Sequence, residues 1–478
     1  MPLTFKNDES NAADILVIGL TKDSTFDPII QKYTALPYTP QLNLAAKDTN
    51  ILMHPQKNQK IVILGLGESK DEHKIDQYYR SAIFNQRDKT VRKIDVVCDH
   101  LTDQQLINAV IGIRKSIINH GAFKTNGSKY QEPEISIIVN TARNAIVQQG
   151  LHIAEAQIGV MFLVDHPSNI KTPIFIGDYA KASGEKYGYS VQVLDKAELT
   201  ALKMDALLAV GQGSSNPPVC IVMEYKPKGK NTKTPTLGLV GKGVSFDTGG
   251  ISIKPATNMG YMKCDMGGGA AVIGAIELAA RLALDIHIVG IVPAAENSVD
   301  ALSIRPGDVI GSYSGKSIEV IDTDAEGRLI LADAVAYINK HFQPAYLIDL
   351  ATLTGSCVAT LGYHAAGMFT HNDDMAQDLS KIGHDINERV WRLPLWEDYA
   401  AEMNSDIADI KNLSGKPVAG AISAAKFVEF FTGEHPKWVH LDIAGVAFGD
   451  SEFAKMRTAT GYGVRLLVKY MELLINKK

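Results

Sequence analysis

The sequence predicts an α/β protein with two domains, a smaller N-terminal α/β domain and a larger C-terminal α/β domain with a mixed, mostly buried sheet. The chain has 478 residues, which is enough for two or three domains of about 150 residues each. Short β-branched segments alternate with longer segments of helical periodicity, as in α/β proteins. In the second part of the chain most apolar segments are continuously apolar, which is typical of strands buried on both faces.

The first domain is expected at residues 1–164. Its strands are predicted where β-branched residues cluster, at residues 14–20, 60–67, 93–98 and 134–140. Residues 142–163 carry apolar side chains at helical spacing and end before Pro167, so we expect a helix there that connects the two domains.

The second domain is expected at residues 165–478. Its strands are predicted at residues 190–194, 219–224, 236–241, 285–292, 317–321 and 345–350. No internal repeat of about 20–50 residues is apparent, which argues against a solenoid.

Composition and charge exclude several classes of protein. The chain carries 48 Lys and Arg against 53 Asp and Glu, a formal net charge of −5, and 45% of its residues are hydrophobic. This balance argues against a nucleic-acid-binding or membrane-surface protein. The four cysteines are scattered without a C-x-x-C pair, which favours a reducing compartment over a disulfide framework.

The sequence shows no export signal and no membrane helix. The N-terminus is polar and acidic, and the apolar stretch at residues 266–276 is too short to span a bilayer. We therefore expect a cytoplasmic protein. The chain also lacks H-E-x-x-H, G-x-S-x-G, a Walker loop and a G-x-G-x-x-G after a strand, which argues against histidine zinc proteases, serine hydrolases, nucleotide triphosphatases and dinucleotide enzymes.

Two blocks of the second domain concentrate acidic residues. The first block, residues 240–269, and the second, residues 321–334, contain the candidate site residues Lys242, Asp247, Lys254, Asp265, Asp322, Asp324, Glu326 and Arg328. If the second block is extended, its alternate residues project from one face at intervals of about 6.5–7 Å. Its three carboxylates and one guanidinium would then share one site.

Such a density of carboxylates requires positive charge. Two divalent cations about 3.5–4 Å apart form a recognised hydrolytic arrangement. The four carboxylates at positions 247, 265, 324 and 326 contribute −4, which two such cations would balance. Lys254 and Arg328 would then remain as a positive site suited to an oxyanion.

Each feature also has a simpler interpretation. The F-D-T-G-G segment is most often a turn, and residues 322–333 nearly fit an EF-hand calcium loop, although the preceding segment resembles a strand rather than a helix. His364 and His440 are more typical of hydrogen-bonded core or surface residues than of ligands. The glycines at 267–269 are typical of a closely packed helix start.

Several motifs resemble the leucine aminopeptidase (cytosol aminopeptidase) family of two-metal exopeptidases. They are DTDAEGRL at 322–329, VGKGVSFDTGG at 240–250, MKCDMGGG at 262–269, DLATLTG at 349–355, HLDIAG at 440–445 and ALLAVGQGSSNPP at 206–218. The resemblance covers essentially the whole second domain, residues 165–478, and implies a di-metal aminopeptidase catalytic domain there. The first domain resembles the family only in its α/β character.

The resemblance implies a role for each acidic or basic residue. One metal would be held by Lys242, Asp247, Asp265 and Glu326, and the other by Asp247, Asp324 and Glu326. The metals would be manganese or zinc and would activate a bridging water. Lys254 and Arg328 would be the catalytic residues, with Lys254 stabilising the oxyanion and Arg328 holding a bicarbonate that relays a proton.

The resemblance also implies how substrate binds. The free amine of a peptide would bind a metal and Asp265, and the side-chain pocket would be lined by Met262, Thr352, Gly355 and Ala444, whose small or apolar character suits leucine-like residues. Asp322 departs from the family, which usually has Asn there.

The sequence therefore predicts a metal-dependent aminopeptidase acting on peptides, with the homohexameric assembly of the family. Two alternatives are a two-metal phosphoesterase and a non-enzymatic peptide- or DNA-binding module. The net charge of −5 disfavours DNA.

Overall fold

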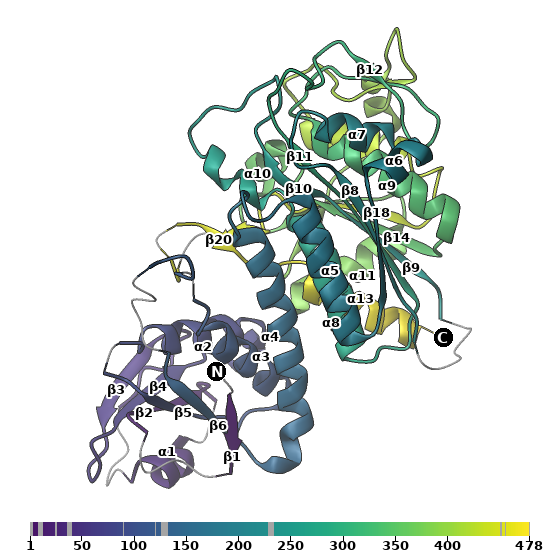
Figure 1. Ribbon diagram of the computed structural model, residues 1–478. Helices are drawn as coiled ribbons and strands as arrows, with labels where there is room; N and C mark the ends of the chain where they lie inside the picture. The colour runs from purple at the N-terminus through teal and green to yellow at the C-terminus, as the bar shows by residue number, and fades with distance from the viewer. Residues whose placement is uncertain are drawn as a thin grey trace. The chain divides into compact units, whose positions relative to one another are not determined.

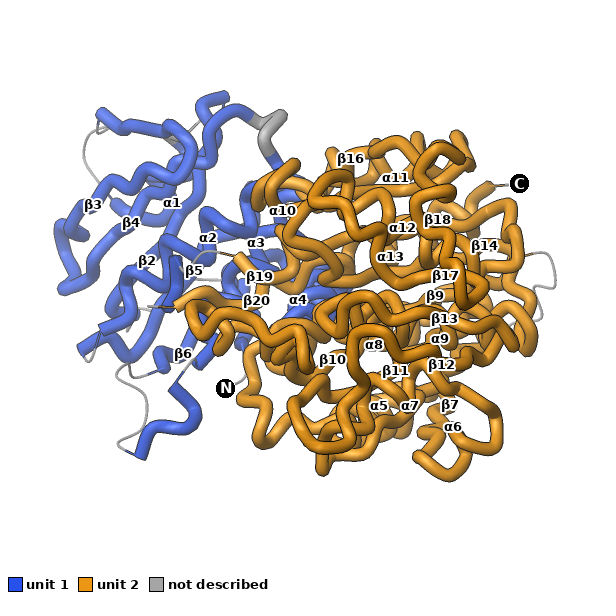
Figure 2. Tube along the Cα trace, turned by 90° about the horizontal axis from the view of Figure 1, so that it is seen from above, with its two compact units in different colours: residues 1–158, 452–455 blue, residues 159–451, 456–478 orange. Residues whose placement is uncertain are grey.

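The computed structural model of the protein describes residues 3–7, 13–23, 26–35, 41–88, 90–119, 121–125, 132–227, 234–449, 452–454 and 456–477. The chain divides into two compact units, unit 1 with residues 1–158 and 452–455 and unit 2 with residues 159–451 and 456–478 (Figure 2). Each unit combines a sheet with helices, so the predicted α/β class is confirmed (Figure 1). The division falls inside helix α4 (Asn144–Asp165), the predicted connecting helix.

Unit 1 contains a six-stranded sheet in the order β1-β6-β5-β2-β4-β3. Its strands are β1 (Thr4–Lys6), β2 (Ile15–Leu20), β3 (Thr49–Met53), β4 (Lys60–Gly65), β5 (Lys93–Val97) and β6 (Glu134–Ile138). Only β3 runs antiparallel to its neighbour among these pairings. The four predicted strands are β2, β4, β5 and β6, which are largely buried. The two strands that were not predicted, β1 and β3, lie at the edges of the sheet. Their residues are exposed or half-buried, so they lack the apolar pattern of a buried strand.

Three further helices belong to unit 1: α1 (Phe26–Thr34), α2 (Ile75–Phe84) and α3 (Asp103–Lys115). The start of α3 follows from its sequence, because Thr102 and Gln105 form a reciprocal capping box. Residues 452–454 pack against α2, where the Phe453 ring meets Phe84 edge-on at 5.3 Å between centroids.

Unit 2 contains a nine-stranded sheet in the order β16-β15-β18-β14-β9-β11-β8-β7, with β10 also paired to β11. Its strands are β7 (Ser190–Leu194), β8 (Val219–Tyr225), β9 (Leu237–Gly241), β10 (Gly243–Asp247), β11 (Ile288–Asn297), β14 (Tyr346–Ala351), β15 (Ala366–Phe369), β16 (Val390–Arg392) and β18 (Trp438–Asp442). The strands β18, β14, β9 and β11 are parallel. At one end β8 runs antiparallel to β11 and β7 antiparallel to β8, and at the other end β15 runs antiparallel to β18. The mixed and mostly buried sheet is therefore as predicted.

Helices cover both faces of this sheet (Figure 1). One face carries α5 (Pro173–Tyr187), α8 (Gly267–Arg281) and α13 (Val464–Asn476), and the other carries α7 (Asp205–Gly211), α9 (Glu326–Phe342) and α12 (Gly420–Phe430). The remaining helices of unit 2 are α6 (Lys196–Leu202), α10 (Gly355–Leu361) and α11 (Asp373–Asp385). A Cβ atom on Gly268 would lie 2.0 Å from the Leu350 carbonyl oxygen, so the expected close packing at this helix start is confirmed.

Small sheets accompany the large one. The first joins β12 (Val309–Ile310), β13 (Ile318–Glu319) and β17 (Ile410–Lys411), and the second joins β19 (Phe448–Gly449) and β20 (Thr458–Ala459). The strand expected at residues 317–321 is the short β13, which lies outside the large sheet. Across the described part of the chain, no helix is both long and apolar enough to cross a membrane.

Candidate active site

The two acidic blocks meet in unit 2 around the ends of parallel strands. Lys242 directly follows β9, Asp247 is the last residue of β10, and Glu326 is the first residue of α9. Asp265 follows a short 3-10 helix, η3 (Met259–Cys264), and precedes α8. Because the carboxyl ends of parallel strands meet at one edge of a sheet, residues far apart in the chain converge there.

Lys242 is buried between two carboxylates. Its side chain is 3% exposed, and its Nζ lies 2.6 Å from Asp265 Oδ2 and 2.7 Å from Glu326 Oε1. The same Nζ donates a hydrogen bond to the Thr352 carbonyl oxygen at 3.1 Å. The Lys242 side chain also passes close to Gly327, and a Cβ atom added at Gly327 would lie 2.6 Å from this Nζ. Only glycine at position 327 therefore leaves room for the lysine.

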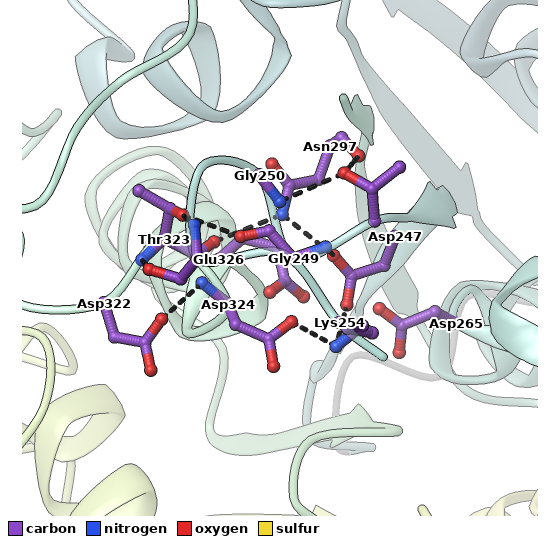
Figure 3. A network of polar contacts seen from close by, with 12 residues as sticks. Asp247, Gly249, Gly250, Lys254, Asp265, Asn297, Asp322, Thr323, Asp324 and Glu326 are labelled. Atoms are coloured by element: carbon purple, nitrogen blue, oxygen red, sulfur yellow. Dashed lines mark hydrogen bonds and ion pairs between the residues drawn. The ribbon is translucent and has the colours of Figure 1, made fainter. Parts of the chain in front are cut away.

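Lys254 lies between the other two carboxylates (Figure 3). Its Nζ is 2.7 Å from Asp247 Oδ2 and also pairs with Asp324. An ordinary ion pair between Lys242 and Asp247 would have been the simplest alternative to a metal site, but here Asp247 pairs with Lys254. Each of the two ammonium groups thus pairs with two carboxylates, which leaves two of the four negative charges uncompensated by lysine.

The pKa values of Lys242 and of two acidic residues of the cluster are all raised, for different reasons. Burial would lower the pKa of Lys242, but the Asp265 and Glu326 carboxylates outweigh it and hold that pKa above its ordinary value. Burial raises the pKa of Asp324 to about 7, and the charges of Asp247 and Glu326 act in the same direction. The pKa of Asp265 is also raised, chiefly by burial. Both acidic shifts arise first from burial, and the neighbouring carboxylates add to them.

The donor set fits divalent cations. One carboxylate oxygen from each of Asp247, Asp265 and Glu326 lies within 4.8 Å of the other two, and all three residues are buried. Glu326 Oε2 is buried and accepts no hydrogen bond. Since a buried carboxylate oxygen without a partner is destabilising, this atom is suited to a cation.

A layer of polar residues supports these carboxylates. Asn297 donates from Nδ2 to Asp247 Oδ1 at 2.8 Å and to the Thr323 carbonyl oxygen at 3.1 Å (Figure 3). Thr323 in turn donates from Oγ1 to the Gly249 carbonyl oxygen at 2.6 Å. Asn297 thereby joins the end of β11 to both acidic blocks.

Arg328 is held by a residue that lies far from it in the chain. Its Nη1 donates to the Asn412 carbonyl oxygen at 2.7 Å, while its buried Nε has no hydrogen-bond partner. Burial lowers the pKa of Arg328 to about 10. The Asn412 side chain also accepts the Ile321 amide at 2.7 Å and donates to the Asp322 carbonyl oxygen at 2.7 Å. Asn412 therefore fixes both the guanidinium and the loop before it.

The extended conformation considered for residues 322–328 is not the one that the structure shows. Residues 322–325 form a turn in which Asp322 Oδ1 accepts the Asp324 amide at 2.8 Å, and helix α9 begins at Glu326. Glu326 and Arg328 therefore lie on a helix rather than on one face of a strand. The EF-hand alternative also fails, because strand β13 precedes the turn and Asp333 accepts two backbone amides, from Leu207 and Tyr313.

The residues expected to line the pocket lie on three segments. Thr352 directly follows β14 and Gly355 is the first residue of α10, whereas Ala444 follows β18 and Met262 lies in η3. Thr352 donates from Oγ1 to Asp265 Oδ1 at 2.7 Å, and the Asp265 amide donates to the Met262 carbonyl oxygen at 3.3 Å. The structure thus joins Met262 and Thr352 to the acidic cluster.

Sequence reasoning missed Asn297, Thr323 and Asn412. Thr323 lies inside the second acidic block. Asn297 is the last residue of a buried apolar strand, and a polar residue in that position could have indicated its role. Nothing in the local sequence distinguishes Asn412 from a loop residue.

Comparisons with known proteins decide the family. The catalytic-domain profile of the cytosol aminopeptidase family matches residues 160–468. A probable cytosol aminopeptidase of Rickettsia felis is 38% identical over 98% of this chain and 99% of its own length. The chain belongs to the cytosol aminopeptidase family. The resemblance recognised in the sequence is therefore confirmed.

Other relatives match two thirds or more of the chain. A probable cytosol aminopeptidase of Chloroherpeton thalassium is 51% identical over 67% of this chain, and the chain spans 62% of that protein. Among solved structures, the bottromycin maturation enzyme BotP in complex with Mn has a TM-score of 0.85 and 28% identity, covering 97% of this chain and 100% of that one. The fold is therefore shared along nearly the whole chain.

Proposed function

We propose that this protein is a metal-dependent aminopeptidase that hydrolyses the N-terminal peptide bond of peptides. The proposal rests on the buried cluster of Asp247, Asp265 and Glu326. Lys242 pairs with Asp265 and Glu326, and Lys254 pairs with Asp247. Family membership supports a peptidase rather than a phosphoesterase or a peptide- or DNA-binding module.

Two divalent ions, manganese or zinc, are the proposed cofactors. One would be held by Lys242, Asp247, Asp265 and Glu326, and the other by Asp247, Asp324 and Glu326. When bound, the ions supply a Lewis acid for the scissile carbonyl and a bridging water of lowered pKa. BotP, the structural relative, was solved with Mn.

Lys254 and Arg328 are the proposed catalytic residues. In this structure Lys254 neutralises Asp247 and Asp324. Once cations engage those carboxylates, its ammonium is available to a developing oxyanion. Arg328 keeps one buried N–H without a partner, and this group can hold a small anion such as bicarbonate, which takes up and returns a proton.

Substrate selection follows from the acidic cluster and its neighbours. The free α-amine of a peptide would bind a metal and Asp265, so a chain end is favoured over an internal bond. Met262, Thr352, Gly355 and Ala444 line the pocket for a leucine-like side chain, and the Thr352 hydroxyl joins that pocket to Asp265.

The proposal extends to domains, assembly and location. Residues 165–478 are the catalytic domain and residues 1–164 the N-terminal domain. A homohexamer is proposed from family membership. The cytoplasm is the proposed location, which agrees with four cysteines that form no disulfide.

Hydrolysis of leucyl amides tests this function. We expect cleavage of leucyl-p-nitroanilide, loss of activity on chelation and recovery with manganese or zinc. N-acetyl-leucyl-p-nitroanilide serves as the matched control, because its amine is blocked. Equal cleavage of both substrates would contradict an exopeptidase, and mass photometry that finds a monomer would contradict the hexamer.

A further inference from the structure

A buried carboxylate that belongs to neither acidic block lies at the end of β18. Asp442 is fully buried, and its Oδ1 accepts the Leu353 amide at 3.2 Å and the Ala444 amide at 3.1 Å. Its Oδ2 accepts the hydroxyl of Thr354 at 2.6 Å. One carboxylate therefore joins the segment after β14 to the segment after β18.

These bonds coincide with the proposed substrate pocket. Leu353 and Thr354 lie directly between the pocket residues Thr352 and Gly355, and Ala444 is itself a pocket residue. At its other end the segment is anchored to the metal-binding cluster, since Thr352 bonds Asp265 and accepts a bond from Lys242. The pocket wall thus has one anchor at the cluster and another at Asp442.

The strand that carries Asp442 is itself firmly held. Trp438 Nε1 donates to Asp349 Oδ2 at 2.7 Å, and His440 Nδ1 lies 2.5 Å from Asp349 Oδ1. Asp349 lies on the neighbouring strand β14, in register with His440. Because side chains at positions 438, 440 and 442 share one face of the strand, this attachment fixes the place from which Asp442 reaches the pocket.

We propose that Asp442 is a positioning residue that determines side-chain specificity by holding the segment 352–355 at a set distance from Ala444. The inference rests on the proposed function, because it concerns the pocket of that site. Asp442 acts through two backbone amides and the Thr354 hydroxyl. Its loss leaves three polar groups without an acceptor, so the wall relaxes and the pocket loses its shape.

The ratio of kcat/KM for two substrates of different side-chain size measures this role. In Asp442→Ala all three bonds are lost, and we expect the ratio of kcat/KM for leucyl- over alanyl-p-nitroanilide to fall by about tenfold or more, as expected when pocket contacts to a few methylenes are lost. In Asp442→Asn one oxygen still accepts both amides, so a smaller loss of the same sign is expected. Two bound metals should remain in both variants, because Asp442 is not a proposed ligand.

Asp333 provides the matched control. It is also a fully buried carboxylate, and it accepts the Leu207 amide at 2.9 Å and the Tyr313 amide at 2.7 Å, away from the proposed pocket. Asp333→Asn and Asp333→Ala should lower the midpoint of unfolding and leave the leucyl-to-alanyl ratio unchanged.

The outcomes separate this inference from the proposed function. A native chain that cleaves leucyl amides, together with Asp442 variants that keep the native ratio, overturns the inference alone. A ratio that collapses equally in the Asp333 variants overturns it as well, since general loosening would explain the loss. A native chain that cleaves none of the amides overturns the proposed function and the pocket with it. If Asp442→Ala does not fold, the ratio of Asp442→Asn decides.

Discussion

Replacing Lys242 by methionine removes the ammonium that pairs with both Asp265 and Glu326. Both contacts are buried, at 2.6 and 2.7 Å, and each corresponds to a gross attraction of about 6 kcal/mol at an effective dielectric constant of about 20. The net loss is smaller, because one carboxylate can take up a proton in place of the lost charge. For a carboxyl group with an ordinary pKa near 4, this uptake costs about 4 kcal/mol at pH 7 and about 1.5 kcal/mol at pH 5.

We therefore expect Lys242→Met to lower the free energy of unfolding by about 4 kcal/mol at pH 7 and by about 1.5 kcal/mol at pH 5. The loss of stability grows with pH because the folded variant keeps a proton on one carboxyl group, whereas the unfolded chain releases that proton as pH rises. In the native chain the pKa of Lys242 is raised, so its contribution is complete throughout this range and is lost only at alkaline pH.

Urea unfolding of the chelator-treated protein at both pH values measures this effect. The three tryptophans lie at 391, 396 and 438, all in unit 2, so their fluorescence reports on the unit that contains the site. Lys426→Met is the control, because Lys426 is equally buried and pairs with Glu397 and Glu429, yet Glu397 is 80% exposed. There we expect a loss of about 1 kcal/mol or less. Equal losses in both variants, or a Lys242→Met loss that does not change with pH, would refute the reasoning.

Three further predictions concern the same site. Gly327→Ala places a Cβ atom 2.5 Å from Lys242 Cε, so activity and tight metal binding should both fall. Gly260→Ala is the control, because its Cβ atom would have nothing within 4 Å, and it should leave both unchanged. Metal analysis and amide hydrolysis measure these effects, and two tightly bound metals in Gly327→Ala would contradict the prediction. Asp322→Asn should retain activity, because its remaining oxygen can still accept the Asp324 amide; inactivation with metals retained would make Asp322 a participant in catalysis. Manganese affinity, measured by calorimetry, should be weaker at pH 6 than at pH 8, because Lys242 must release its proton to bind a metal; an affinity that does not change with pH would remove Lys242 from the ligand set.

Much of the fold follows from local sequence. The buried strands β2, β4, β5, β8, β9 and β14 were predictable, because a continuous apolar run can only be accommodated inside a sheet. The edge strands β1 and β3 were not, since their partly exposed residues have no such pattern. The domain division at 164/165 stays a prediction, as do the roles of the individual site residues.

The conformation of the second acidic block shows where local reasoning fails. Alternating acids from 322 to 326 match a strand, but Ala325 at the start of α9 makes no side-chain cap, so the helix start has no capping signal. The helix forms because its apolar face packs against the large sheet. A tertiary contact thus overrode the pattern.

By itself the sequence determined the fold class, the family and the residue types available for chemistry, because these depend on apolar runs and on contiguous motifs. Only the tertiary structure decided which charges meet. Lys242 pairs with Asp265 and Glu326, and Lys254 pairs with Asp247 and Asp324, because the fold brings the ends of β9 and β10 to the turn before helix α9. The same holds for Asn412, Asn297 and Asp442. Each is a single polar residue that bonds to a segment far away in the chain, and no local sequence motif marks it. Its structural role arises in the folded protein, where buried polar groups must find hydrogen-bond partners.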